Sequence, residues 1–421
     1  MLRNKVSAIF VISLLIFTVK LQSQININSP FSRYGLGIVE ESSLNQNKAL
    51  GTSGVGYRDA KHINFQNPAS YGVLDSMAFL FETGVHSDFM RFTEDTLSDR
   101  GFSGGLGYIS MAFPITKWWG SALGVLPFSR VGYTLTKKSD LYSYNYSGDG
   151  GQNKLVWGNA FDPLPFLSIG FNTCYIFGET YYQSETKFNV GYFNTLKAQT
   201  TKITGLYFET GLLLHHEIYK NATLALGFTF APAQNLKSNS TNIIASVDSA
   251  TQINVFSDEK LTSGDVQIPM KMGYGISYVL KNKLLVTAEY TMQDWTGIKS
   301  NSASENNLKN ETKISGGIEI IPNIYAPRGY FNKIAYRIGG YYKNTYIQLQ
   351  EEVNGAYLPL KDFGMSFGVE CPFRKTRNSI SVAASVGKKY TNSEKLLREN
   401  YIMLDFNITL RETWFVKAKI D

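Results

Sequence analysis

Few side chains in this sequence have the types and spacing that catalysis or metal binding requires. The chain has four histidines: His62, His86, His215 and His216. His215 and His216 are adjacent in an alternating run, so a strand would point them to opposite faces, where they cannot share a metal ion. His86 and Glu82 fall on one face of a predicted strand, but a single pair of this kind is a weak signal. We therefore expect no enzyme, no metal site and no bound cofactor.

Charged residues instead recur opposite apolar faces. In the stretch 268–295, Met270, Met272 and Tyr274 occupy one face and Lys271 the other, and the alternation resumes after a short polar turn. A period of two predicts β-strands. Charges placed in this way occur along the whole chain: Glu82, Glu209, Lys271, Glu289, Arg337, Glu370 and Asp405. A charge facing lipid at mid-depth costs roughly 2–4 kcal/mol for Arg or Lys, whereas the lumen of a barrel tolerates it. In a membrane barrel these residues would form a lumen network, either paired with one another or in contact with a ligand.

Bulk composition agrees with an all-β protein. The chain has 421 residues, 43% of them hydrophobic and 14% aromatic, with 37 glycines. Its two cysteines, Cys174 and Cys371, are too far apart to indicate a disulfide framework. The formal charge of +7 is scattered over the chain, so nucleic-acid binding is not indicated.

The N-terminus predicts export. Residues 1–23 have the basic start, the apolar stretch and the cleavage region of a signal peptide. Residues 24–76 are rich in Gly, Ser, Asn and Pro, which favours irregular backbone, so we interpret them as a plug segment. Residues 77–421 would form the barrel. We expect the outer membrane of a Gram-negative bacterium as the location.

The lengths of the connections separate a membrane barrel from a soluble sandwich. We predict about 14 strands, an even number, as single-chain outer-membrane barrels require. Joins from odd to even strands are mostly long and polar, as at 92–100, 136–163 and 237–265. Joins from even to odd strands are mostly tight, as at 115–117, 177–178, 218–221, 281–282 and 374–377. Outer-membrane barrels have long external loops and short periplasmic turns, so this alternation favours a transmembrane antiparallel β-barrel.

Several segments resemble the FadL-type outer-membrane transporters of long-chain fatty acids and other hydrophobic compounds, as a divergent branch. The stretch Ala49–Gly54 followed by Asn67-Pro68-Ala69 looks like that family's N-terminal hatch, and 124–128 is similar to its Gly…Pro-Phe strand segment. The resemblance implies a 14-stranded barrel plugged by a hatch. It implies hatch or gate roles for one set of residues: Gly51, Gly54, Asn67, Pro68 and Ala69. It also implies a lateral opening of the wall near Pro127 and Phe128.

Two functions follow as hypotheses. The first is passive transport of a hydrophobic, fatty-acid-like small molecule, with binding in the lumen and release sideways or past the hatch into the outer-membrane lipids. The second is a barrel that does not transport but serves as scaffold or partner of a protein-secretion complex. An apolar lumen pocket beside Asn67–Ala69 would favour the first hypothesis. A filled, ion-paired lumen with a large external patch would favour the second.

Overall fold

The computed structural model describes residues 29–75, 77–188, 193–247, 254–296, 308–327, 329–351, 355–374 and 376–413. The predicted signal peptide at 1–23 lies outside these residues. No helix within the described ranges is long and apolar enough to cross a membrane.

The strands form one antiparallel sheet that closes on itself, because the last strand pairs with the first long one, β17 with β2. The first half of the wall comprises β2 (Ala78–Glu94), β3 (Leu97–Thr116), β4 (Trp119–Lys138), β5 (Tyr142–Leu164), β6 (Leu167–Phe188), β7 (Asn194–Tyr219), β8 (Ala222–Ala231) and β9 (Gln234–Val247). The second half comprises β10 (Asn254–Ile268), β11 (Lys271–Leu280), β12 (Leu284–Gln293), β13 (Glu311–Ile320), β14 (Ala335–Gln350), β15 (Tyr357–Pro372), β16 (Ser379–Tyr390) and β17 (Arg398–Thr413). A short 3-10 helix, η3 (Tyr330–Lys333), lies between β13 and β14.

Two prolines interrupt the wall without ending it. Beyond Pro232 the chain continues from β8 into β9, and both of these strands pair with β7. Pro269 separates β10 from β11 in the same way. At the first break the side-chain amide of Gln234 bonds to both the N–H and the carbonyl of Phe208, which replaces a missing backbone pair. Counting each interrupted pair as one strand, the described residues form a closed barrel of fourteen strands, as predicted.

Three details of the predicted strand assignment are wrong. The region 136–163, interpreted as a loop, is largely strand β5, and the expected turn at Phe177-Gly178 lies inside the continuous strand β6. Similarly, 237–265 contains most of β9 and β10 and is not an open loop. The count of fourteen still holds because the omission of β5 and the division of β6 offset each other. Tight turns at the opposite end are present near 117–118, 220–221 and 281–283, close to the predicted positions.

The outer surface carries the apolar half of the alternation. In β11, Tyr274, Ile276 and Tyr278 are each more than a third exposed, as expected for a lipid-facing side. Glycine and serine, at Gly273, Gly275 and Ser277, face inward. The alternation therefore positions small side chains toward the lumen, where the N-terminal segment packs against the wall.

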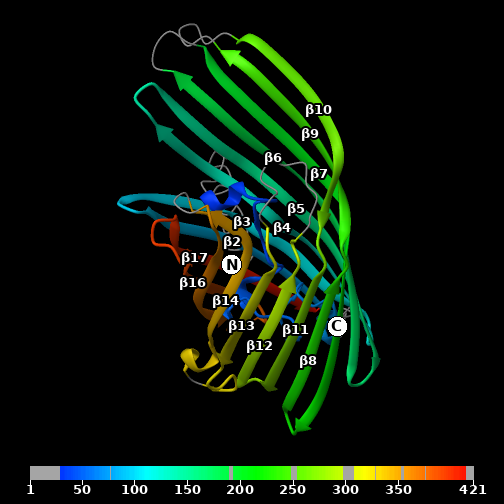
Figure 1. Cartoon of the computed structure of the whole chain (residues 1–421). Helices are drawn as coiled ribbons and strands as arrows, with labels where there is room; N and C mark the ends of the chain where they lie inside the picture. The colour runs from blue at the N-terminus through cyan, green and yellow to red at the C-terminus, as the bar shows by residue number, and fades with distance from the viewer. Residues whose placement is uncertain are drawn as a thin grey trace, which may run out of the picture.

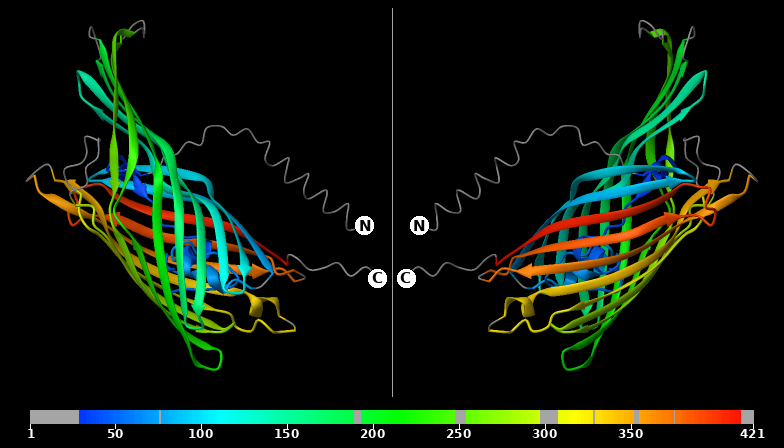
Figure 2. Two further views of the ribbon diagram at one scale, coloured as in Figure 1. Left: turned by 90° about the vertical axis from the view of Figure 1, so that its right-hand side faces the viewer. Right: turned by 90° about the vertical axis from the view of Figure 1, so that its left-hand side faces the viewer.

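One side of the barrel rises far beyond the rest. Figure 1 shows β5, β6, β7, β9 and β10 continuing upward as a tall curved sheet, and Figure 2 shows the same extension in profile. We refer to the upper part of these five strands as the extension. It lies on the side opposite the tight turns, which makes the extension extracellular in the predicted orientation.

The N-terminal segment lies inside the barrel. Its elements are the 3-10 helix η1 (Pro30–Arg33), the two-residue strand β1 (Ile38–Val39), the short helix α2 (Asn45–Ala49) and the 3-10 helix η2 (Pro68–Val73). Nearly all of its apolar side chains are buried, including Phe31, Leu44, Leu50 and Phe65. Figure 2 shows this segment enclosed by the strands.

Candidate functional site: the plugged lumen

Three asparagines hold the N-terminal segment in a defined shape. The amide of Asn47 donates to Asn64 and to the carbonyl of Ser53, and Asn64 donates to the carbonyls of Gly54 and Tyr57. Asn67 caps η2 by accepting from the N–H of Ala69 at 3.0 Å. Such side-chain bonds to backbone replace the regular hydrogen bonding that a Gly- and Asn-rich chain lacks. The segment is therefore an ordered plug.

Asn67 also joins the plug to the wall. Its amide donates to the carbonyl of Val55 at 2.7 Å and to that of Leu212, in β7, at 3.3 Å. Asn67, Pro68 and Ala69 are all buried, and Pro68 and Ala69 lie against the backbone of Gly170 so closely that a Cβ there would be 2.4 Å away. The predicted hatch motif thus packs directly against the wall.

Glycine lets the plug touch the wall backbone to backbone. A Cβ on Gly51 would lie 2.5–2.7 Å from backbone atoms of Gly340 and Gly316, and its φ of +71° is in the left-handed region. Gly54 has a different neighbour, because its Cβ would collide with the Gln66 and Asn47 side chains of the plug itself. The two glycines named from the sequence therefore have separate packing roles.

Carboxylates on the wall bind the plug directly. Glu289, in β12, accepts from the N–H groups of Gly54 at 2.7 Å and Val55 at 3.0 Å. It also lies 2.8 Å from the Nζ of Lys313, which in turn contacts Glu41 of the plug at 2.5 Å. Burial opposes ionisation of Glu41, but nearby lysines, Lys313 first, outweigh it and lower the pKa of Glu41 to about 2.

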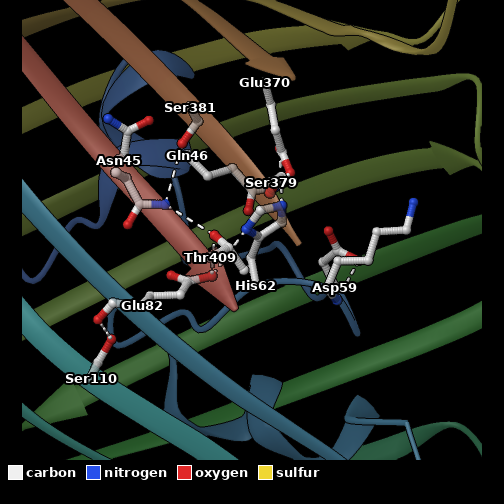
Figure 3. Close-up of polar contacts among 12 residues, drawn as sticks. Asn45, Gln46, Asp59, His62, Glu82, Ser110, Glu370, Ser379, Ser381 and Thr409 are labelled. Carbon is white, nitrogen blue, oxygen red and sulfur yellow. Dashed lines mark hydrogen bonds and ion pairs between the residues drawn. The ribbon is translucent and has the colours of Figure 1, made fainter. Parts of the chain in front are cut away.

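A second anchor is centred on His62. Its Nδ1 lies 3.1 Å from Glu82, and its Nε2 lies 3.1 Å from Glu370. Figure 3 shows the ring between these two carboxylates, with Asp59 nearby. Burial disfavours the charged ring, yet Glu370 and Glu82 outweigh this and raise the pKa of His62 to about 10. Both ring nitrogens are thus proton donors at neutral pH.

The remaining lumen charges are also inside the barrel. Arg337 contacts Glu319 at 2.6 Å and also bonds to Glu370. Asp405 pairs with Lys48 of the plug at 2.5 Å. Glu209 contacts Lys154 at 3.5 Å. Lys271 lies beside a small cavity of about 30 Å³, which Glu41 and Glu209 also line. Of the seven charges named from the sequence, all but Lys271 thus have a close partner of opposite sign among the described residues.

Sequence reasoning missed several of these partners. Lys154 is buried, pairs with Glu209 and donates to Ser42 of the plug at 2.6 Å. It lies in β5, within the stretch interpreted as a loop. The alternation of Lys154, Val156 and Gly158 with Leu155 and Trp157 is the signal that identifies it.

The wall changes at Pro127. Pairing between β3 and β4 runs from Thr116↔Trp119 to Ile109↔Val125 and is not present above that pair among the described residues. The register of β4 against β5 shifts between Pro127 and Ser129. Beyond this point the edge of β4 that pairs with β3 lower in the wall pairs with β1 of the plug. The N–H of Glu40 also donates to the carbonyl of Phe128 at 2.9 Å. Where the barrel's own pairing stops, the plug takes the place of the neighbouring strand.

The upper lumen is apolar but occupied. Phe31 and Leu36 of the plug join one buried cluster with Trp295 and Tyr346 of the wall, whose rings stack 4.4 Å apart. Tyr346 also donates to the carbonyl of Gly37. Plug side chains therefore fill the apolar space in the upper lumen.

No catalytic constellation appears among the described residues. The spacing G-x-S-x-G does occur at 101–105, but it lies within β3 and not at a strand-to-helix turn, and Ser103 is buried. His86 contacts Arg130 at 2.5 Å, so this nitrogen accepts and the ring is neutral. Within the described ranges, no group of three His, Cys, Asp or Glu side chains has the geometry to hold a metal.

Solved structures share this architecture. The barrel is similar to the toluene transporter TodX of Pseudomonas putida (15% identity, TM-score 0.60, covering 89% of this chain and 99% of that one). It is also similar to a FadL homologue of Pseudomonas aeruginosa (12%, 0.59, 90% and 100%) and to the toluene transporter TbuX of Ralstonia pickettii (13%, 0.57, 88% and 98%). At these identities the likeness shows the fold alone. No curated protein matches the sequence.

Fold and plug together define the class: a FadL-like transmembrane β-barrel whose lumen is closed by its own N-terminal segment. The model of the BamG family matches residues 3–421. The chain belongs to the BamG family.

Proposed function

We propose that this protein is a permanently plugged outer-membrane barrel that acts as a scaffold or partner in a protein-export complex and not as an open channel. The observation that carries the proposal is the buried ion-pair network between plug and wall. Lys313 joins Glu41 to Glu289, and His62 joins Glu82 to Glu370. Removing one partner of a buried pair costs roughly 3–5 kcal/mol, so any movement that separates the plug from the wall is expensive.

The extension supports the same proposal. It carries exposed apolar side chains, including Leu261 (76% exposed), together with Tyr146, Tyr181 and Ile244, and Leu141 (73% exposed) lies directly before β5. Apolar surface on a part of the wall that projects beyond the rest of the barrel is typical of protein contact sites. Its outer strand β10 also has one edge that pairs with no described strand, because β11 and β12 begin and end lower in the wall.

A native gel of outer membranes tests this function. The wild-type chain is expected to migrate in a complex, whereas a variant with the β9–β10 tip shortened (residues 241–261 replaced by Asn-Gly) would migrate as a free barrel. Its folded state is checked by the shift in gel mobility on heating. A wild-type chain that migrates alone in native membranes would contradict the proposal.

Transport of a hydrophobic compound is the second candidate, favoured by the interrupted wall at Pro127 and by the shared fold. In this case the segment 29–40 would be displaced from the edge of β4. Purified protein would then bind a fluorescent fatty acid saturably, and deletion of residues 24–70 would abolish the binding. Absence of saturable binding would leave the scaffold function as the better account.

A further inference from the structure

A cavity lies at the end of the lumen that has the tight turns, which is periplasmic in the predicted orientation. Its volume is about 200 Å³. It is lined by the plug around 59–62 and by the ends of β13 to β17. The connection before η3, η3 itself and the connection between β15 and β16 complete the lining. It is separate from the hatch motif at Asn67–Ala69. His62 and Glu370 line it as part of the plug anchor, but the functions argued above do not use its cations Lys333 and Arg377.

The acidic side chains in this lining are already occupied. Glu319 and Glu370 both bond to Arg337, and Glu370 also contacts His62. Asp59 accepts from the hydroxyl of Tyr57 at 2.8 Å. Glu319 and Glu370 are therefore neutralised by Arg337 and His62, and the charge of Asp59 faces Lys61 and Arg411.

Two cations in the lining remain without a carboxylate among the described residues. Lys333 and Arg377 form no ion pair with any described residue. Lys61 donates to the side-chain oxygen of Asn282 at 3.3 Å and lies near the Asp59 carboxylate. In addition, Arg337 is buried and its Nη1 has no hydrogen-bond partner within the described ranges. The lining thus offers positive charge and free N–H groups with no internal acceptor.

The same cavity has an apolar wall. Ile321, Ile324 and Pro372 contribute to it beside the cations. Clustered cations fit the oxygen atoms of a phosphate or carboxylate, and apolar side chains fit a short hydrocarbon portion.

We propose that this periplasmic cavity binds a small amphipathic anion, with its phosphate or carboxylate held by Lys333 and Arg377 and its apolar part against Ile321 and Ile324. Such a group has two sources, a free metabolite or the headgroup of an anionic phospholipid in the periplasmic leaflet. The inference does not depend on the scaffold function, because either a closed or a transporting barrel has this end of the lumen.

Calorimetric titration of the full chain in uncharged detergent tests the site, with hexyl phosphate as the probe and hexanol as its neutral counterpart. Hexyl phosphate is expected to bind saturably and hexanol is not. In the double variant Lys333→Gln/Arg377→Gln the affinity for hexyl phosphate should fall at least tenfold. Neither side chain takes part in an ion pair with a described residue, so the barrel should still fold, as the heat-dependent gel shift will check.

The matched control is Lys117→Gln/Lys220→Gln, which removes two exposed lysines from other tight turns at the same end. Its affinity for hexyl phosphate should stay within twofold of the wild type. The proposal is overturned if the wild type shows no saturable binding, or if both double variants weaken binding equally.

Nanodiscs distinguish the two sources. If the headgroup of a lipid fills the site, phosphatidylglycerol discs will lower the apparent affinity for hexyl phosphate at least tenfold relative to phosphatidylcholine discs. If the natural ligand is a free anion, the two lipids will give the same affinity. Either result supports an anion site, provided that the Lys333/Arg377 variant still loses binding.

Discussion

The Nζ of Lys313 lies 2.8 Å from a carboxylate oxygen of Glu289, and both side chains are buried in the lumen. The same carboxylate accepts two backbone N–H groups of the plug, and the same ammonium contacts Glu41. Glu289 and Lys313 of the wall thus hold the plug through both ion pairs and hydrogen bonds. This arrangement makes the plug part of the folded structure and not a loosely seated lid.

Replacing Lys313 tests the strength of this anchor. Lys313→Met leaves Glu41 and Glu289 buried without their cation, so we expect the free energy of unfolding in urea to fall by roughly 3–5 kcal/mol. The control is Lys202→Met, because Lys202 and Glu179 are 3.8 Å apart and each is 60% exposed. An exposed ion pair contributes about 0–1 kcal/mol, so the free energy of unfolding of the control variant should hardly change. Equal effects of the two substitutions would refute a special role for Lys313.

Two neighbouring glycines of β14 provide a matched test of plug seating. A Cβ on Gly339 would meet backbone atoms of Gly51 and Leu50 at 2.2–2.3 Å, whereas one on Gly340 would have a single contact at 3.4 Å. Gly339→Ala should therefore push the plug away from the wall and expose residues 29–75 to protease. Gly340→Ala should leave them protected. Limited proteolysis of the folded barrels, followed by mass spectrometry, measures the difference.

His62 predicts how stability depends on pH. Folding raises the pKa of His62 from 6.5 to about 10, so the stabilisation is fully present below pH 6.5 and is lost as the pH rises toward 10. Wild-type stability should fall over this range by on the order of 3 kcal/mol. His62→Gln should be less stable at pH 6.5 and show a flatter profile, whereas His216→Gln, at an exposed position, should follow the wild type. Parallel profiles for wild type and His62→Gln would exclude this role.

Asn67 is expected to be structural. Asn67→Ala removes a helix cap and two donated hydrogen bonds to carbonyls, so unfolding should become easier by about 2 kcal/mol. Asn392→Ala, in the connection between β16 and β17, removes a single exposed contact to Lys361 and serves as control. Chemical denaturation measures both. An Asn67→Ala variant with unchanged stability but altered ligand binding would instead assign Asn67 to a gate.

The alternation of side chains predicts the barrel because lipid and lumen impose opposite demands on successive residues. For this reason the amino-acid pattern alone predicts the two faces of β11 and β12 correctly. The alternation fails in β5, where Gly148, Gly150 and Gly151 interrupt it and Tyr142, Tyr144 and Tyr146 resemble a loop rich in aromatics. Membrane-strand length also misleads here, since the extension carries β6 and β7 well past the membrane.

The site is less predictable than the wall. The alternation places Glu289 and Lys313 in the lumen, but which charges meet depends on how the plug seats against the wall. Lys48 and Asp405 are 357 positions apart, and His62 meets Glu370 across a similar separation. Only the folded plug brings them together, so the amino-acid pattern predicts a lumen network but not its pairs.

The central claim is that the plug stays in place while the protein works. Ser53 and Ser315 have hydroxyl oxygens 3.0 Å apart across the plug–wall contact, so Ser53→Cys/Ser315→Cys in a background lacking Cys174 and Cys371 can lock the two together. The measurement is whether the oxidised, locked barrel still enters its native-membrane complex and restores a strain that lacks the wild-type gene. Our account predicts full assembly and full complementation. Loss of both on oxidation, with recovery on reduction, would contradict it and indicate that plug movement is required.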